Sequence, residues 1–130
     1  MMESITETCV VQASKEDVFN FLSDIKNLPD WSTQFVKKLF VVGEKYKAIT
    51  PLGDVFVRID AMPLAGLIDI YAGPTEQNMR PAYLRVIRFD DATTGVMFTF
   101  FRWDETDDKS WKAFGEWIKI EVGNIKRLFS

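Results

Sequence analysis

The amino-acid sequence predicts an α+β protein in which an antiparallel sheet of about six strands wraps around a long C-terminal helix. Three observations support this prediction. The last twenty residues, 111–130, place apolar side chains at steps of three and four. The stretch 37–103 consists of short apolar or alternating runs separated by Gly and Pro. Between the first strand and that stretch, the pattern changes to helical spacing twice.

Composition narrows the class of protein. The chain has 130 residues, net charge −3 and no histidine. The acidic balance argues against binding to nucleic acid, and the lack of histidine excludes Ser-His-Asp chemistry and most zinc sites. We therefore expect one domain spanning residues 1–130, no metal or other cofactor, and a monomer or homodimer.

The expected location is the cytoplasm. Cys9 is the single cysteine, which favours a reducing compartment. The N-terminal residues do not form a signal-peptide pattern, and no apolar run approaches the roughly 18 residues of a membrane-spanning helix.

The first elements are a strand over 4–12 and two short helices. The strand places Ile5, Cys9 and Val11 on one side, and Glu7 falls on that same side. Ser14 and Asp17 approximate a capping box for the first helix. A second helix is predicted near Pro29, because proline suits a first helical turn.

The next segments are predicted strands. Their expected ranges are 39–42, 46–50, 54–62, 67–72, 83–89 and 96–103. Residues 90–95 are predicted to close a hairpin, and the polar residues 75–81 are predicted to form a loop.

The C-terminal helix has one strongly apolar face. This face comprises Trp111, Phe114, Ile118, Val122, Ile125 and Phe129. Ser110 is the predicted N-cap, and Lys126 and Arg127 fall in the last turn, where cations suit the helix dipole. Residues 104–109 are interpreted as an acidic, solvated connection into this helix.

The order of elements and the stretch 13–35 resemble the START/polyketide-cyclase (SRPBCC) superfamily, the helix-grip proteins that include the birch-pollen allergen. The residues that carry the resemblance are Ala13-Ser14, Glu16-Asp17-Val18-Phe19, Leu22-Ser23-Asp24 and Asn27-Leu28-Pro29-Asp30-Trp31. The resemblance implies that a curved sheet grips the C-terminal helix around a cavity. In many members of the superfamily this cavity binds lipids, sterols, polyketides or other apolar molecules. These motif residues are structural, so they do not specify a function.

Glu121 is the most informative candidate site residue. At about 100° per residue it lies between Phe114, Trp117, Ile125 and Leu128, away from the charged face. One interpretation is a ligand contact or a general acid or base. The other is an edge residue that reaches solvent or pairs with an arginine of the sheet. Glu7 is the second inward carboxylate, unless it lies at the rim of the sheet.

Arginines and aromatic residues complete the predicted site. Arg58 is interpreted as facing solvent, whereas Arg85 and Arg102 are candidate anchors for an acidic group. The predicted pocket lining consists of Trp31, Phe35, Phe100, Trp111, Phe114 and Trp117, and the alternative for each is ordinary core packing.

Three functions remain open at the level of sequence. The first is binding of a small apolar molecule, such as a lipid, polyketide or aromatic metabolite, between the sheet and the C-terminal helix. The second is a cyclase or dehydratase-type enzyme without metal that uses Glu121 as acid or base. The third is a protein-interaction scaffold without a ligand, for which an open apolar groove would be the signature.

Overall fold

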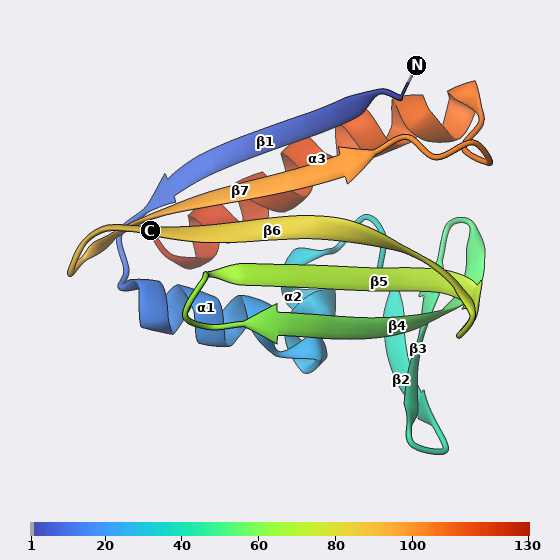
Figure 1. Cartoon of the computed structure of the whole chain (residues 1–130), viewed down its shortest axis with the longest axis horizontal. Helices are drawn as coiled ribbons and strands as arrows, with labels where there is room; N and C mark the ends of the chain where they lie inside the picture. The colour runs from blue at the N-terminus through green and yellow to red at the C-terminus, as the bar shows by residue number, and fades with distance from the viewer. Residues whose placement is uncertain (1) are drawn as a thin grey trace.

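The computed structural model describes residues 2–130 and contains one seven-stranded antiparallel sheet, with the long helix α3 lying across it (Figure 1). The strand order is β1-β7-β6-β5-β4-β3-β2. In chain order the elements are β1 (Ser4–Val11), α1 (Lys15–Ser23), the 3-10 helix η1 (Ile25–Asn27), α2 (Leu28–Trp31), β2 (Lys38–Val42), β3 (Lys45–Thr50), β4 (Gly53–Met62), β5 (Leu67–Thr75), β6 (Asn78–Asp90), β7 (Thr93–Phe101) and α3 (Asp108–Leu128). This is the predicted α+β helix-grip architecture, and its seven strands correspond to the seven predicted ranges.

The N-terminal elements form where the sequence predicts them. Ser14 is the N-cap of α1, and its side chain accepts a hydrogen bond from Asp17 N at 3.1 Å. Pro29 lies in the first turn of α2. Trp31 ends α2 and is fully buried, in edge-to-face contact with Phe98 of β7.

The β5–β6 hairpin differs most from expectation. Residues 75–81 were predicted to form a loop, but β5 continues to Thr75 and β6 begins at Asn78, so only two residues make the turn. The register shifts between Ala72 and Thr75, which accommodates Pro74 in the strand. The prediction was wrong because a polar hairpin tip has the composition of a loop although its backbone is paired.

The final helix starts one turn before the predicted position. Asp107, not Ser110, is the N-cap of α3, and Asp107 Oδ1 accepts a hydrogen bond from Ser110 N at 2.7 Å. Ser110 therefore occupies the third helical position. Lys126 and Arg127 lie in the last turn as predicted.

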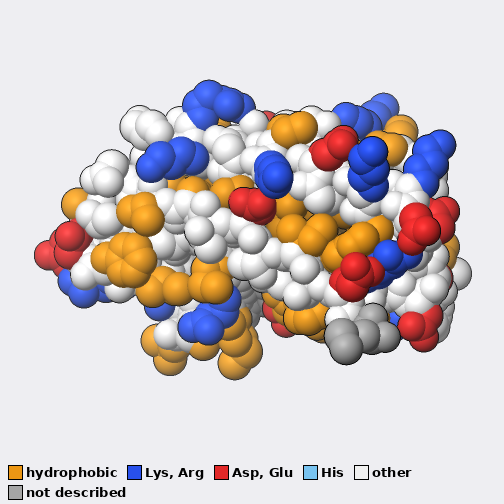
Figure 2. Space-filling model, turned by 90° about the horizontal axis from the view of Figure 1, so that it is seen from above, with side chains coloured by type: hydrophobic (Ala, Val, Ile, Leu, Met, Phe, Trp, Pro, Cys, Tyr) orange, Lys and Arg blue, Asp and Glu red, His pale blue; other side chains and the backbone are white. Residues whose placement is uncertain are grey.

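The hydrophobic core lies between one face of the sheet and the helices. Ile118, Val122 and Ile125 are the buried apolar residues of α3, which packs mainly against β1. The view from above, onto the side of the molecule that carries β1 and α3, shows hydrophobic atoms exposed among side chains of both charges, with most Lys and Arg side chains along the upper edge of the view (Figure 2). Val10 of β1 and Ile120 of α3 are among the exposed apolar residues.

Candidate functional site

A cavity of about 390 Å³ lies between the inner face of the sheet, the segment after α2 and the part of α3 from Ser110 to Glu121. Its walls are mostly apolar and aromatic. The lining residues are Ser32, Phe35, Leu52, Asp54, Val55, Ile70, Ala72, Gly73, Pro74, Arg80, Pro81, Ala82, Phe98, Phe100, Phe101, Trp103, Glu105, Thr106, Ser110, Phe114, Trp117 and Glu121. The volume is within the range of small-molecule sites, roughly 300–1,000 Å³.

Glu121 supplies a buried carboxyl group to this cavity. Its side chain is 1% exposed, and none of the ion pairs among residues 2–130 includes it. The alternative of an edge residue that reaches solvent or pairs with an arginine of the sheet is therefore wrong. One oxygen, Oε2, accepts three hydrogen bonds, each 3.1 Å long, from Ser32 Oγ, Gln34 N and Phe35 N. Among residues 2–130, no side chain or backbone group donates to Oε1.

Burial raises the pKa of Glu121 from its ordinary value to about 7. Removal of the carboxylate from water is the largest cause, because the charged form is poorly solvated in an apolar site. The three hydrogen bonds and the ammonium group of Lys37 oppose this effect and lower the pKa. Glu121 therefore changes its charge near neutral pH.

The segment that donates to Glu121 is also bound by Asn124, one turn further along α3. Asn124 Nδ2 donates to Trp31 O at 3.0 Å and to Thr33 Oγ1 at 2.9 Å, and Asn124 Oδ1 accepts from Arg127. Together, Glu121 and Asn124 attach the segment 31–35 to α3. This attachment positions Phe35 as a wall of the cavity.

The walls near Glu121 are aromatic. The ring of Phe114 lies 5.3 Å from that of Trp117 and 6.1 Å from that of Phe100, measured between centroids. Phe35 lies 6.5 Å from Trp117. These residues come from α3, β7 and the segment after α2, so the cavity exists only when the three parts are packed together.

Charged residues also line the cavity. Arg80 of β6 forms a bidentate ion pair with Glu105, with distances of 2.7 and 3.3 Å. The guanidinium group of Arg80 also lies over the ring of Trp103, 4.6 Å from its centroid. Besides Glu121, Asp54 is the remaining charged residue of the lining.

The structure brings five of the nine predicted site residues to the cavity: Phe35, Phe100, Phe114, Trp117 and Glu121. Trp31, Arg85 and Trp111 do not line it. Trp31 is buried in the core, and Arg85 is exposed on the opposite face of the sheet. Arg58 faces solvent as expected, paired with Asp60.

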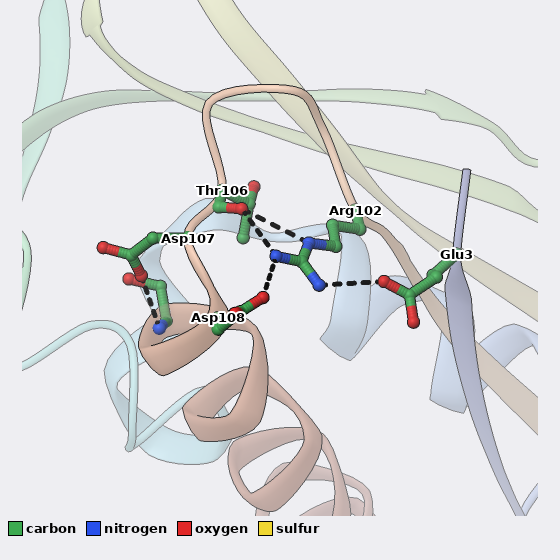
Figure 3. Close-up of polar contacts among 6 residues, drawn as sticks. Glu3, Arg102, Thr106, Asp107 and Asp108 are labelled. Atoms are coloured by element: carbon green, nitrogen blue, oxygen red, sulfur yellow. Dashed lines mark hydrogen bonds and ion pairs between the residues drawn. The ribbon is translucent and has the colours of Figure 1, made fainter. Parts of the chain in front are cut away.

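Arg102 lies outside the cavity and connects three parts of the chain instead (Figure 3). Its guanidinium group pairs with Glu3 at 2.9 Å and with Asp108 at 2.6 Å, and it donates two hydrogen bonds to Thr106 O. The expected role as an anchor for an acidic ligand is therefore not supported by its position. Arg102 instead holds the β7–α3 connection, which carries Trp103 and Glu105.

Glu7 faces the α3 side of the sheet as predicted and is half-buried, but it does not line the cavity. Sequence reasoning missed Arg80 and Glu105, because 75–81 was predicted to be a loop and 104–109 a solvated connection, and it missed Trp103, which was placed at the end of the predicted strand 96–103. A usable signal existed for Arg80: Ala82, Leu84 and Val86 share one face of β6, and extending this alternation backwards places Arg80 on the same face.

Within residues 2–130, no group of three or more Cys, Asp or Glu side chains is arranged to hold a metal ion. No helix in the described part of the chain is long and apolar enough to span a membrane.

Comparison with known proteins shows similarity at the level of structure. No family model and no curated protein sequence matches this chain. Zhui aromatase/cyclase from Streptomyces sp. R1128 superposes with a TM-score of 0.74 at 15% identity, covering 98% of this chain and 93% of that chain. A START superfamily protein from Mycobacterium smegmatis superposes with a TM-score of 0.71 at 12% identity, covering 97% of this chain and 96% of that chain. The Aha1 dimer from Colwellia psychrerythraea superposes with a TM-score of 0.69 at 17% identity, covering 98% of this chain and 96% of that chain.

These structures have the same fold over nearly the whole chain but low sequence identity to it. The similarity therefore establishes the architecture and does not transfer an activity. Together with the seven-stranded sheet and the gripped helix α3, it shows that this chain has the helix-grip fold of the START and polyketide-cyclase proteins.

Proposed function

We propose that this protein binds a small, mostly apolar molecule in the cavity between the sheet and α3. The observation that carries the proposal is the cavity itself, about 390 Å³ with predominantly apolar and aromatic walls. A monomeric protein that needed these rings only for its core would pack them against one another without leaving such a space. The aromatic wall residues come from α3, β7 and the segment after α2, which are far apart in the sequence. A binding site formed by tertiary packing is expected to draw its residues from such separate segments.

The first test is to find the ligand. Native mass spectrometry of the protein purified from its own host, compared with the denatured mass, should show an additional species of a few hundred daltons. If the native mass is that of the polypeptide alone, both before and after incubation with a lipid and polyketide extract, the binding proposal fails.

A substitution that fills the cavity with a side chain is the second test of ligand binding. Ala82 lines the cavity on β6, and the substitution Ala82→Phe places a ring in the space of the ligand. We expect Ala82→Phe to lose ligand binding by about tenfold or more, since a ligand and the new ring cannot occupy the same volume. Ala61→Phe, at an exposed position on β4, is the control and should bind as the unmodified protein does. Equal binding by both variants would place the ligand elsewhere.

A second function, acid–base catalysis of the cyclase or dehydratase type, is favoured by one specific observation. Glu121 lines the cavity and has a pKa of about 7, where a carboxyl group can both donate and accept a proton at neutral pH. An aromatase/cyclase is among the structures of the same fold. The discriminating variant is Glu121→Gln: an enzyme would convert its ligand as the unmodified protein and leave it chemically unchanged as the variant, whereas a carrier would return the ligand chemically unchanged in both forms.

A further inference from the structure

We propose that the ligand of this cavity carries a hydrogen-bond donor, either a hydroxyl group or a protonated amine, which binds Glu121 Oε1, and that anionic ligands are excluded. This inference rests on the proposed function, because it describes the chemistry of the same site. It goes further in assigning a polar end to the ligand, a partner atom to that end, and a class of molecules that the site rejects.

The first argument is the asymmetry of the carboxyl group. Oε2 accepts hydrogen bonds from Ser32 Oγ, Gln34 N and Phe35 N, so its hydrogen-bonding capacity is used inside the protein. Oε1 receives none from the described residues, although Glu121 is 1% exposed and lines the cavity. Among residues 2–130, Trp31 Nε1 is the one fully buried polar side-chain atom without a hydrogen-bond partner, so Oε1 is not sealed in the core and a donor on the ligand can reach it from the cavity.

The second argument is the charge of the lining. Asp54, Glu105 and Glu121 contribute three carboxyl groups, and Arg80 is the single cation among the lining residues described. The guanidinium group of Arg80 is already engaged by both oxygens of Glu105. Lys37 acts on Glu121 from outside the lining, with its ammonium group donating to Thr33 O. A carboxylate or phosphate ligand would thus enter a site of its own sign.

The third argument is the environment of Oε1. Phe35, Phe114 and Trp117 line the same cavity, and the faces of aromatic rings attract cations as well as apolar groups. This surrounding accepts the apolar body of either a hydroxyl-bearing or an amine-bearing ligand. The aromatic rings cannot replace the hydrogen bonds that water donates to an anionic group.

The experiment uses four probes with one ring system and different end groups: naphthalene, 2-naphthol, protonated 2-naphthylmethylamine and 2-naphthoate. Their dissociation constants are measured with the full-length protein by isothermal titration calorimetry at pH 7.5. We expect the naphthol, the amine or both to bind about tenfold more tightly than naphthalene, and the naphthoate to bind more weakly than naphthalene.

The pH dependence separates the two donor chemistries. Below pH 7 the Glu121 carboxyl group is protonated, and a protonated amine must displace that proton to form an ion pair. Affinity for the amine should therefore fall by about tenfold per pH unit well below pH 7, while affinity for the naphthol changes little. Preference for the amine with this slope identifies a cationic ligand, and preference for the naphthol without it identifies a hydroxyl ligand.

Glu121→Gln is the decisive variant. Its amide oxygen can accept the hydrogen bonds from Ser32, Gln34 and Phe35, which leaves the amide NH₂ group toward the cavity and replaces an acceptor with a donor. Glu121→Gln should lose the preference for the donor probes and bind naphthoate more tightly than the unmodified protein. Glu116→Gln removes a carboxylate from the exposed side of the same helix and should leave all four constants unchanged.

Two results would overturn the inference, and they differ in what else they affect. Equal binding of all four probes, or tightest binding of naphthoate, contradicts the donor requirement but leaves the cavity as an apolar binding site. Failure of all four to bind, naphthalene included, contradicts the proposed function together with this inference. If Glu121→Gln does not fold, the probe preferences and pH slopes of the unmodified protein decide alone.

Discussion

Glu121 performs two roles with its two carboxyl oxygens. Oε2 attaches the segment after α2 to α3, and Oε1 is left to the cavity. The first role explains how a carboxyl group is tolerated at a 1% exposed position, because three donors compensate part of its desolvation. The compensation is incomplete, which is why the pKa is about 7 and not near its ordinary value.

This imbalance predicts how stability depends on pH. The folded protein binds a proton at Glu121 up to about pH 7, whereas the unfolded chain releases it near the ordinary value of 4.5. The protonated Glu121 thus contributes up to about 3 kcal/mol to the free energy of unfolding. This contribution is fully present below pH 4.5 and is lost as the pH rises through 7.

Urea unfolding of the unmodified protein and of Glu121→Gln at pH 4.5, 6 and 8 measures this effect. The amide does not titrate, so the free energy of unfolding of Glu121→Gln should rise relative to that of the unmodified protein as the pH increases. Glu116→Gln, which removes an exposed carboxylate, controls for the change in net charge. A difference between Glu121→Gln and the unmodified protein that stays constant from pH 4.5 to 8 would contradict the raised pKa.

At the scale of elements, α3 depends on a cap that lies in the connection from β7. Asp107 accepts the hydrogen bond from Ser110 N, while the adjacent Asp108 pairs with Arg102. The cap therefore fixes the position where the connection ends and the helix begins. Because Trp103 and Glu105 lie in this connection, the start of α3 also bears on the lining of the cavity.

Asp107→Ala should lower the free energy of unfolding by about 1 kcal/mol, since it removes the cap acceptor. Asp107→Asn keeps an acceptor of the same shape and should retain most of the stability. Thermal or urea unfolding of the two variants provides the measurement. If both lose the same amount, the charge of Asp107 matters and its capping hydrogen bond does not.

At the scale of the whole molecule, the cavity depends on the close pairing of β5 with β6. A Cβ atom added at Gly73 would lie 1.9 Å from Asn78 O and 2.7 Å from Met79 Cα, both backbone atoms that cannot move aside cheaply. This pairing brings Pro74 and Arg80 to the lining from strands on either side of the hairpin. The glycine is thus required by the close approach of two strands.

Gly73→Ala should lower the free energy of unfolding by about 2 kcal/mol and weaken ligand binding, because the hairpin must open to admit the methyl group. Gly123→Ala is the matched control: it adds the same methyl group to an exposed helical position with nothing within 4 Å, and should raise stability by about 0.5–1 kcal/mol. Denaturant unfolding and a ligand titration test both variants. Unchanged stability of Gly73→Ala would show that the hairpin is not tightly constrained.

The sequence by itself determined the elements and the faces that they present. Apolar spacing identified α3 and its buried side, and the same spacing singled out Glu121, because helical periodicity is a local property. Strand alternation placed Glu7 and Arg58 on their correct sides. The first and last residues of helices and strands were less predictable, as 75–81 and Asp107 show, because polar residues are equally common in hairpin tips, caps and loops.

Only the tertiary structure decided which of these residues meet. Glu121 is 89 residues from Ser32 and 86 from Phe35 in sequence, and no local pattern predicts that the segment after α2 donates to it. In the same way, Arg85 and Arg102 had sequence contexts typical of site residues, but the sheet turned one outward and the start of α3 engaged the other. Periodicity defines the face of a single element, whereas a cavity is the space left between several, so its lining is fixed by how the elements pack.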